Sequence, residues 1–300
     1  MIAPILIYVN TFVIKTMKIN EISPDQHVFL SRTADIAIPP KTLYFIGKLP
    51  AGNTKTVTIV GSRRPTAYGR EVTQKIAGEL AQAGVVIVSG LALGIDAIAH
   101  AAALDAGGTT IAVLGGGVDD PSPRSNVSLA RRMLMEGGAL ISEYPPGTAP
   151  MQYRFLERNR IVSALGDIVI VTEAAARSGT LSTVGHALEQ GKTVFAVPGN
   201  ITSPLSSGCN QLIKQGALPL TDPSDVLTAL GYGSATQQHL ILGDTPAETA
   251  VIDLLKEGIK DGDTLLLVSK LSTSDFNQTL TMLELKGIIR PLGGHQWTLV

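Results

Sequence analysis

The segment TVTIVGSRRPTAYGREVTQKIAGELAQAGVVIVSGLALG, residues 56–94, decides the fold. A β-branched apolar run at 57–60 is followed by a helical pattern at 69–83 and a second apolar run at 85–88. Short, continuous apolar runs of this kind are typical of strands that are buried on both faces of a parallel sheet. The segment therefore predicts a strand–helix–strand unit with its two strands parallel.

The same alternation continues along the chain to about residue 215. Further strands are expected at 110–114, 139–142, 168–171 and 193–197, and further helices at 95–106, 125–136, 157–165, 181–190 and 208–215. Parallel strands are joined by right-handed crossovers, so this order predicts an α/β fold with a Rossmann-like, doubly wound parallel sheet.

The pattern changes after residue 230, where the polar stretch GYGSATQQ at 231–238 is typical of a linker. The elements expected beyond it are a helix from Thr245 to 256, a second helix capped by Asp263 and ending near 270, a third capped within Ser272–Ser274 and ending near 286, and a hairpin at Gly293-Gly294. Three helices followed by a hairpin predict a small winged-helix domain. The expected organisation is a short N-terminal segment at 1–40, the Rossmann-like domain at 41–230, a linker at 231–243 and the winged helix at 244–300.

Composition excludes several classes of protein. Of the 300 residues, 44% are hydrophobic and 16% charged, which excludes a mainly disordered chain. The single cysteine, Cys209, excludes a disulfide framework, and the sequence shows no base that would activate its thiol. The apolar run at 1–14 is too short to span a bilayer and lacks the features of a secretory signal. The sequence thus predicts a cytoplasmic protein with no membrane partner.

Candidate binding residues follow the predicted strands, because ligands of parallel α/β sheets lie beyond the carboxyl ends of the strands. The formal net charge of −1 means that an anion site depends on local clusters of arginine. After the first strand come Ser62, Arg63 and Arg64, which offer a hydroxyl and two guanidinium groups to a phosphate. The dinucleotide fingerprint G-x-G-x-x-G is missing at this turn, which argues against NAD-type chemistry. A plain strand-to-helix turn with two solvated arginines is the alternative.

A second cluster is the stretch YRFLERNR at 153–160, which supplies Arg154, Phe155, Arg158, Asn159 and Arg160. Arginines neutralise phosphates and an aromatic ring stacks on a base, which is what an unpaired strand requires. An amphipathic helix start with the ring in the core is the alternative. Two further candidates are the helix start at Ser178, Gly179 and Thr180, an anion cradle, and Arg124, which belongs either to a ligand loop or to a solvated helix face.

Signals of a reaction centre are weak. Asp96 and His100 share a helix face as a metal pair or an acid–base pair would, but a capping aspartate and a hydrogen-bonded histidine fit better. The sequence contains no P-loop, no G-x-S-x-G elbow and no histidine–cysteine metal spacing. We therefore expect a ligand-holding surface with no catalytic residue, no metal and no cofactor.

Taken in order, these segments resemble the DprA/Smf family of DNA-processing proteins over roughly residues 40–230. The matching pieces are Gly61-Ser62-Arg63 with Tyr68-Gly69, 89–96 with His100, 110–117 with Asp119, 142–147, 155–160, Glu173 with 178–181, 194–199 and 207–217. The resemblance implies a non-catalytic homodimer that binds and shields incoming single-stranded DNA and loads the RecA recombinase during natural transformation. It also implies that Arg63, Phe155, Arg158 and Arg160 contact DNA, and that Ser62, Ser178 and Thr180 donate to phosphates.

Two other functions are weighed against this one. A nucleotide phosphoribohydrolase of the lysine-decarboxylase-like (LOG) group would show P-G-G-x-G-T and a nearby glutamate, whereas residues 177–183 read RSGTLST. A nucleotide-sensing module on the same fold is the other alternative.

The predicted winged helix, residues 244–300, has five lysines and arginines against eight acidic residues. We therefore expect it to bind protein or serve assembly rather than hold duplex DNA.

Overall fold

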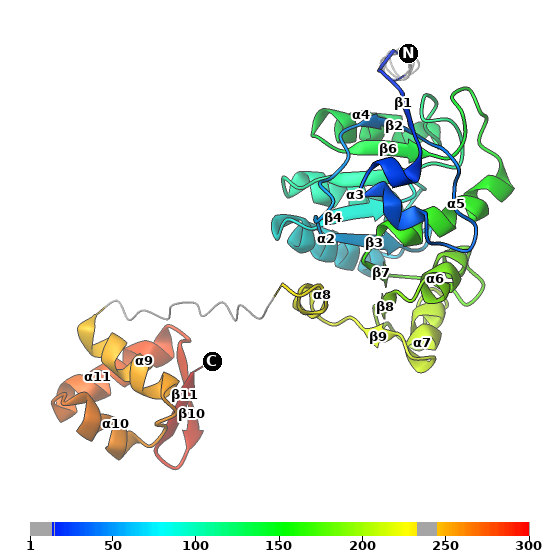
Figure 1. Ribbon diagram of the computed structural model, residues 1–300. Coiled ribbons are helices and arrows are strands. Elements are labelled where there is room, and N and C mark those ends of the chain that lie inside the picture. The colour runs from blue at the N-terminus through cyan, green and yellow to red at the C-terminus, as the bar shows by residue number, and fades with distance from the viewer. Residues whose placement is uncertain (1–13, 15, 233–244, 300) are drawn as a thin grey trace, which may run out of the picture. The chain divides into compact units, whose positions relative to one another are not determined.

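The computed structural model describes residues 14, 16–232 and 245–299 of the chain (Figure 1). The chain divides into two compact units, Met1–Gly231 and Tyr232–Val300. The N-terminal run at 1–13 and the linker residues 233–243 lie outside the described residues. Over the described ranges, no helix has both the length and the apolar character needed to cross a membrane.

The described part of the first unit is built on a nine-stranded sheet of order β1-β2-β6-β5-β4-β3-β7-β8-β9. Its strands are β1 (Asn20–Ile22), β2 (Leu43–Gly47), β3 (Thr56–Val60), β4 (Val86–Ser89), β5 (Thr110–Val113), β6 (Ala139–Ser142), β7 (Ile168–Val171), β8 (Thr193–Ala196) and β9 (Leu218–Pro219). The seven strands that follow one another in the sheet as β6-β5-β4-β3-β7-β8-β9 all pair in parallel. Strand β2 pairs antiparallel with both β6 and β1. The predicted Rossmann-like sheet is confirmed, with an antiparallel edge added.

Helices cover both faces of this sheet (Figure 1). They are α2 (Ala67–Gln82), α3 (Ile95–Asp105), α4 (Val127–Met135), α5 (Gln152–Leu165), α6 (Thr180–Glu189), α7 (Ser207–Lys214) and α8 (Pro223–Ala229), with short 3-10 helices η1 (Pro24–Gln26), η2 (Leu30–Thr33) and η3 (Arg124–Asn126). From β3 to β6 the chain moves through the sheet in one direction, and from β7 to β9 in the other. Right-handed crossovers therefore place α2, α3 and α4 on one face and α6 and α7 on the opposite face.

The reversal of direction between β3 and β7 creates the topological switch point of the sheet. At such a point the loops after two adjacent strands leave toward opposite faces, and a crevice opens beyond the carboxyl ends of the strands. Here those loops begin at Gly61, after β3, and at Thr172, after β7. The fold thus fixes where a ligand site is expected before any side chain is considered.

The segment before residue 41, which the sequence sets apart, packs as part of the first unit. Strand β1 pairs with β2 at the sheet edge, and Phe29 and Leu30 are fully buried in the core. Arg32 donates to Thr56 Oγ1 over 2.6 Å and lies 3.1 Å from a carboxylate oxygen of Asp167. These contacts join the N-terminal segment to the start of β3.

The second unit has the predicted winged-helix order of three helices and a hairpin. Its elements are α9 (Pro246–Lys256), α10 (Gly262–Ser269), α11 (Thr273–Leu285), β10 (Ile289–Gly293) and β11 (Gln296–Leu299). Thr245 and Ser272 cap α9 and α11 as expected. The cap of α10 is Asp261, not Asp263: Asp261 Oδ2 accepts from the amide of Thr264 over 3.0 Å, because the helix begins two residues earlier than the pattern predicts.

The prediction of a hydrogen-bonded His100 is confirmed, with Nδ1 lying 2.6 Å from Thr110 Oγ1. The Thr110 hydroxyl donates its own proton to the carbonyl of Ile87 over 2.7 Å, so Nδ1 of His100 must carry a hydrogen. Nε2 of this fully buried ring has no hydrogen-bond partner within the described residues. A second ring proton would therefore have no acceptor, and burial together with repulsion by Arg158 lowers the pKa of His100 to about 3.

This pKa predicts that stability falls in mild acid. An unfolded histidine titrates near ~6.5, so between that pH and about 3 the unfolded chain binds a proton that the folded chain does not. The contribution is fully present above pH ~6.5 and is lost by up to about 1.4 kcal/mol per pH unit as the pH falls. His100→Asn should show a shallower decline than the unsubstituted chain, measured by urea unfolding from pH 7 to 4.5. Parallel declines would show that His100 does not govern this dependence.

Candidate nucleic-acid interface

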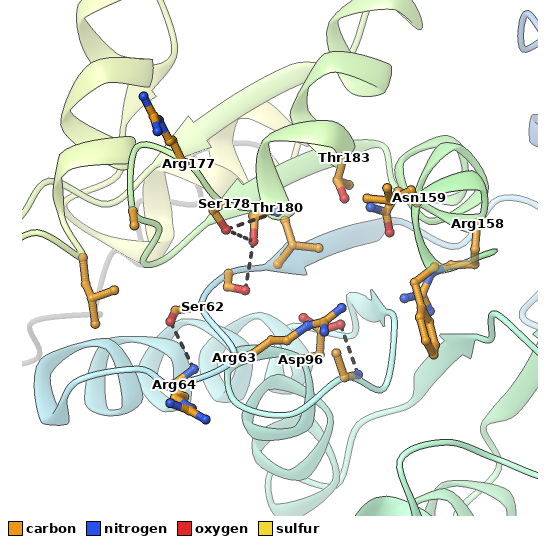
Figure 2. Close-up of a pocket in the computed structure, with 18 of the residues that line it drawn as sticks. Ser62, Arg63, Arg64, Asp96, Arg158, Asn159, Arg177, Ser178, Thr180 and Thr183 are labelled. Carbon is orange, nitrogen blue, oxygen red and sulfur yellow. Dashed lines mark hydrogen bonds between the residues drawn. The ribbon is translucent and has the colours of Figure 1, made fainter. Parts of the chain in front are cut away.

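A pocket of ≈ 500 Å³ opens at the switch point of the sheet. Its lining includes all but three of the predicted binding residues, namely Ser62, Arg63, Arg64, Phe155, Arg158, Asn159, Ser178, Gly179 and Thr180. Figure 2 shows Ser62, Arg63 and Arg64 on one side and Ser178, Thr180 and Thr183 on the other, with Arg158 and Asn159 at one end. We call this the strand-end pocket.

The turn after β3 is held by backbone contacts on both sides. The amide of Ser62 donates to the carbonyl of Glu173 over 2.7 Å, and the amide of Ile95 donates to the carbonyl of Ser62 over 3.1 Å. Gly61 is required for this close approach, because a Cβ there would lie 2.7 Å from Ile95 Cγ1 and 2.9 Å from the Glu173 carbonyl. The turn is therefore rigid, and it projects Arg63 and Arg64 from a fixed base.

Arg63 is an exposed cation in the lining of the strand-end pocket. Its guanidinium lies 6.0 Å from the centroid of the Phe155 ring, within cation–π range. No carboxylate forms an ion pair with Arg63 in the described part of the chain, and its side chain is exposed. An exposed, unpaired guanidinium beside a ring is suited to an anionic ligand that also presents a flat face.

The opposite side of the pocket is the start of α6. Ser178 Oγ donates to Thr180 Oγ1 over 3.0 Å, and Thr180 Oγ1 donates to the carbonyl of Gly61 over 2.9 Å (Figure 2). This chain of hydroxyls ties the loop after β7 to the turn after β3. The first amides of α6 are already bonded, since Thr180 N donates to Ser178 Oγ over 3.2 Å and Leu181 N to the Ser178 carbonyl over 3.1 Å. The helix dipole still places partial positive charge at this end. A Cβ added at Gly179 would meet nothing within 4 Å, so the helix start is open.

Helix α5 closes the end of the pocket through Arg158, which is 4% exposed. Its Nη1 donates to the carbonyl of Gly90 over 2.7 Å and also to the carbonyl of Val113. Burial lowers the pKa of Arg158 to about 10, so the group stays charged at neutral pH. A Cβ at Gly90 would lie 2.6 Å from Nη2, so the loop after β4 needs glycine there. Phe155, one turn earlier, has this second guanidinium 6.0 Å from its ring centroid.

Asp96 contributes the pocket's negative charge. Its Oδ2 accepts from the amides of Gly90 and Ala92 over 3.0 and 3.3 Å, which shapes the loop after β4. The N-cap of α3 is Gly94, so the expectation of a capping aspartate is wrong: Asp96 lies inside the helix and reaches back to the loop. Burial raises the pKa of Asp96, and the nearby Arg158 opposes that rise.

Three predicted residues lie outside the lining of the strand-end pocket. Arg160 is 8% exposed and donates from two nitrogens to the Glu143 carboxylate over 2.7 and 2.6 Å. Arg154 lies over the rings of Tyr144 and Tyr153, with its Cζ at 5.0 and 5.5 Å from their centroids. Arg124 is an exposed residue of η3. We therefore leave these three out of the proposed contact set.

One arginine of the lining, Arg177, was missed by the sequence reasoning. It is exposed and immediately precedes Ser178, and that position before a helix start was the available signal. With Arg63, Arg64 and Arg158 it gives the lining four guanidinium groups against the single carboxylate of Asp96. The strand-end pocket is thus strongly positive in a chain of formal net charge −1.

Groups that could perform chemistry are sparse near the pocket. Cys209 is 1% exposed, and burial raises the pKa of its thiol to about 12, so the thiolate is scarce at neutral pH. Glu173 is 1% exposed, and its carboxylate accepts from the amide and hydroxyl of Thr66 over 2.8 and 2.5 Å. Within the described ranges, no three histidine, cysteine or acidic side chains form a metal-binding group. The arrangement suits holding an anion.

Known proteins share this fold and these motifs. Residues 21–231 match the family model of DNA recombination-mediator protein A, and residues 235–295 match the DprA winged helix domain. Protein Smf of Escherichia coli (strain K12) is 47% identical over 194 residues, which are 65% of this chain and 52% of that protein. DNA processing protein DprA of Bacillus subtilis (strain 168) is 42% identical over 210 residues, 70% of each chain. The chain spans about half the length of the Smf relative.

Two solved structures are similar over the same region. The single-stranded-DNA-binding DNA processing protein A of Helicobacter pylori has a TM-score of 0.65 and 32% identity, over 73% of this chain and 98% of that one. DprA of Streptococcus pneumoniae has a TM-score of 0.66 and 40% identity, over 70% and 74%. The family model covers most of the chain, including every residue that lines the pocket at the switch point. The chain belongs to the DprA/Smf family of DNA-processing proteins.

Proposed function

We propose that this chain binds single-stranded DNA in the strand-end pocket. The observation that carries the proposal is that three exposed arginines, the start of α6 and the Phe155 ring line one pocket, with the Arg63 guanidinium 6.0 Å from the ring centroid. Guanidinium groups and helix-start amides neutralise phosphates, and an aromatic ring stacks on any base without regard to sequence. The H. pylori structure supports the same ligand, because its description concerns single-stranded DNA binding by a chain 32% identical to this one.

The pocket's chemistry favours binding over turnover. Asp96 is occupied by two backbone amides, and Glu173 by Thr66. These hydrogen bonds hold Asp96 Oδ2 and the Glu173 carboxylate in structural roles, which disfavours their use as a general base. The LOG-type hydrolase is therefore disfavoured, and the proposal is a DNA-binding protein without catalytic residues.

The family resemblance extends the proposal to a pathway. We propose that the chain acts in the cytoplasm as a homodimer, shields incoming single strands and loads the RecA recombinase onto them during natural transformation. Family membership supports these roles.

In this proposal the winged helix binds protein or serves assembly and does not hold DNA. Its helix α11 exposes Asp275 and Glu284 and has no basic side chain from Thr273 to Leu285. A helix of this kind gains little from a phosphate backbone.

Arg63→Glu should weaken single-strand binding by about tenfold or more on all sequences, because a charged hydrogen bond contributes about 1.5–3 kcal/mol. The slope of log affinity against log salt should become shallower by about 0.7, the value for one lost phosphate contact. Fluorescence anisotropy of labelled oligonucleotides across a salt series measures both quantities. Arg290→Glu, on exposed β10 of the winged helix, is the matched control. Equal losses in both variants would contradict a site at Arg63.

Oligonucleotides should bind much more tightly than mononucleotides, because several phosphates release counterions together. Competition by dTMP and by short oligothymidylates against a labelled strand measures the difference. Mononucleotide affinity equal to that of the oligonucleotide would favour the nucleotide-sensing module instead.

Gln278→Glu on the exposed face of α11 should leave the affinities for single and double strands unchanged within about twofold. An added carboxylate on a helix that reads DNA would repel phosphates and lower duplex affinity at least several-fold. Anisotropy with a labelled duplex at low salt is the measurement. A marked loss of duplex binding would show that α11 lies on DNA.

A further inference from the structure

A second cavity, of ≈ 340 Å³, lies beside the strand-end pocket. It is lined by Thr66, Tyr68, Gly199, Asn200, Ser203 and Ser206, and we call it the Tyr68 cavity. It adjoins the strand-end pocket along two loops, since Arg64 and Leu205 line that pocket while Thr66 and Ser206 line this one. A strand that leaves the first pocket along either loop reaches the second.

The two cavities differ in charge. Every residue that lines the Tyr68 cavity is neutral, whereas the strand-end pocket has four arginines. Behind the Tyr68 cavity lies the buried carboxylate of Glu173, which accepts from the amide and hydroxyl of Thr66. A negative charge at that depth repels a phosphate. The cavity therefore suits a neutral, polar group rather than an anion.

Tyr68 gives the cavity a flat and anchored surface. The side chain is 45% exposed, and its hydroxyl donates to the carbonyl of Pro198 over 2.8 Å. That hydrogen bond fixes the ring against the loop after β8, so little conformational freedom is lost when a second ring stacks on it. An exposed, immobilised aromatic ring is the platform on which proteins stack unpaired bases.

Two polar side chains of the lining have hydrogen-bonding capacity to spare. Ser206 is 5% exposed, and its hydroxyl makes no hydrogen bond to any residue that the structure describes. Asn200 Oδ1 accepts from the amide and hydroxyl of Thr202 over 3.0 and 2.9 Å, which leaves its Nδ2 hydrogens for a ligand. Both groups line the cavity, so a ligand placed there can take hydrogen bonds from them in place of water.

We propose that the Tyr68 cavity is a nucleobase subsite of the DNA track. One unpaired base stacks on the Tyr68 ring and hydrogen-bonds to Ser206 and Asn200, while its neighbouring phosphates lie among the arginines of the strand-end pocket. The arrangement separates two tasks, with charge neutralised in one cavity and a base held in the other. This inference rests on the proposed single-strand binding.

The experiment measures anisotropy of a labelled oligothymidylate and of a series in which one position at a time is abasic. Three variants are compared with the unsubstituted chain: Tyr68→Ala, Tyr68→Phe and Tyr153→Ala. Tyr153 is the matched control, because it is 50% exposed and lies in the lining of neither cavity. Circular dichroism and thermal unfolding confirm that each variant is folded.

Tyr68→Ala should bind about tenfold more weakly, the lower range for loss of one base–aromatic stack. Its salt slope should stay unchanged, because no phosphate contact is lost. Tyr68→Phe keeps the ring and should lose less than threefold, and Tyr153→Ala should bind as tightly as the unsubstituted chain. In the unsubstituted chain one abasic position should cost about tenfold, and that cost should vanish in Tyr68→Ala.

Equal abasic costs in Tyr68→Ala and the unsubstituted chain would overturn the base subsite while leaving single-strand binding intact. A shallower salt slope in Tyr68→Ala would also overturn it, because the cavity would then hold a phosphate. Failure of the unsubstituted chain to bind any oligonucleotide at low salt would overturn the proposed function and this inference together.

Discussion

The buried guanidinium of Arg158 is the constraint on which the site depends. It is 4% exposed and donates to the carbonyls of Gly90 and Val113, at the carboxyl ends of β4 and β5. Side chains three apart share a helix face, so fixing Arg158 also turns Phe155 toward the pocket. Removing the guanidinium would leave two buried carbonyls unpaired, at about 1–3 kcal/mol each, and would free the helix that carries the ring.

Much of the fold can be predicted from the sequence because six strands are buried on both faces. Each of the six, from β3 to β8, lies within one residue of its predicted bounds. A strand buried on both faces is a continuous apolar run, so its ends are marked by the first polar residues. The antiparallel edge was not foreseen, because β2 pairs with β6, about a hundred residues later, and local pattern carries no information on such a partner. Helix α5 begins at Gln152, ahead of the predicted 157, because its residues before 158 include no buried side chain that would mark a helix face in the sequence.

The site was readable in part. The rule that ligands lie beyond strand ends depends on topology alone, and Ser62, Arg63 and Thr180, which it selects, all line the strand-end pocket. The rule does not distinguish Arg158, which lines the pocket, from Arg160, which lies outside it. Helical geometry distinguishes these two arginines. Residues two apart on a helix are rotated by about 200° from each other, so only one of the two can face the pocket. The other is held by Glu143.

The far edge of the sheet has a consequence for assembly. Strand β9 is two residues long, and Leu220 donates its amide inward to the carbonyl of Ala196. Because backbone groups of a parallel strand alternate in direction, Pro219 faces outward, where it has no N–H to offer. An incoming strand from another molecule finds no donor at that position, which disfavours edge pairing there.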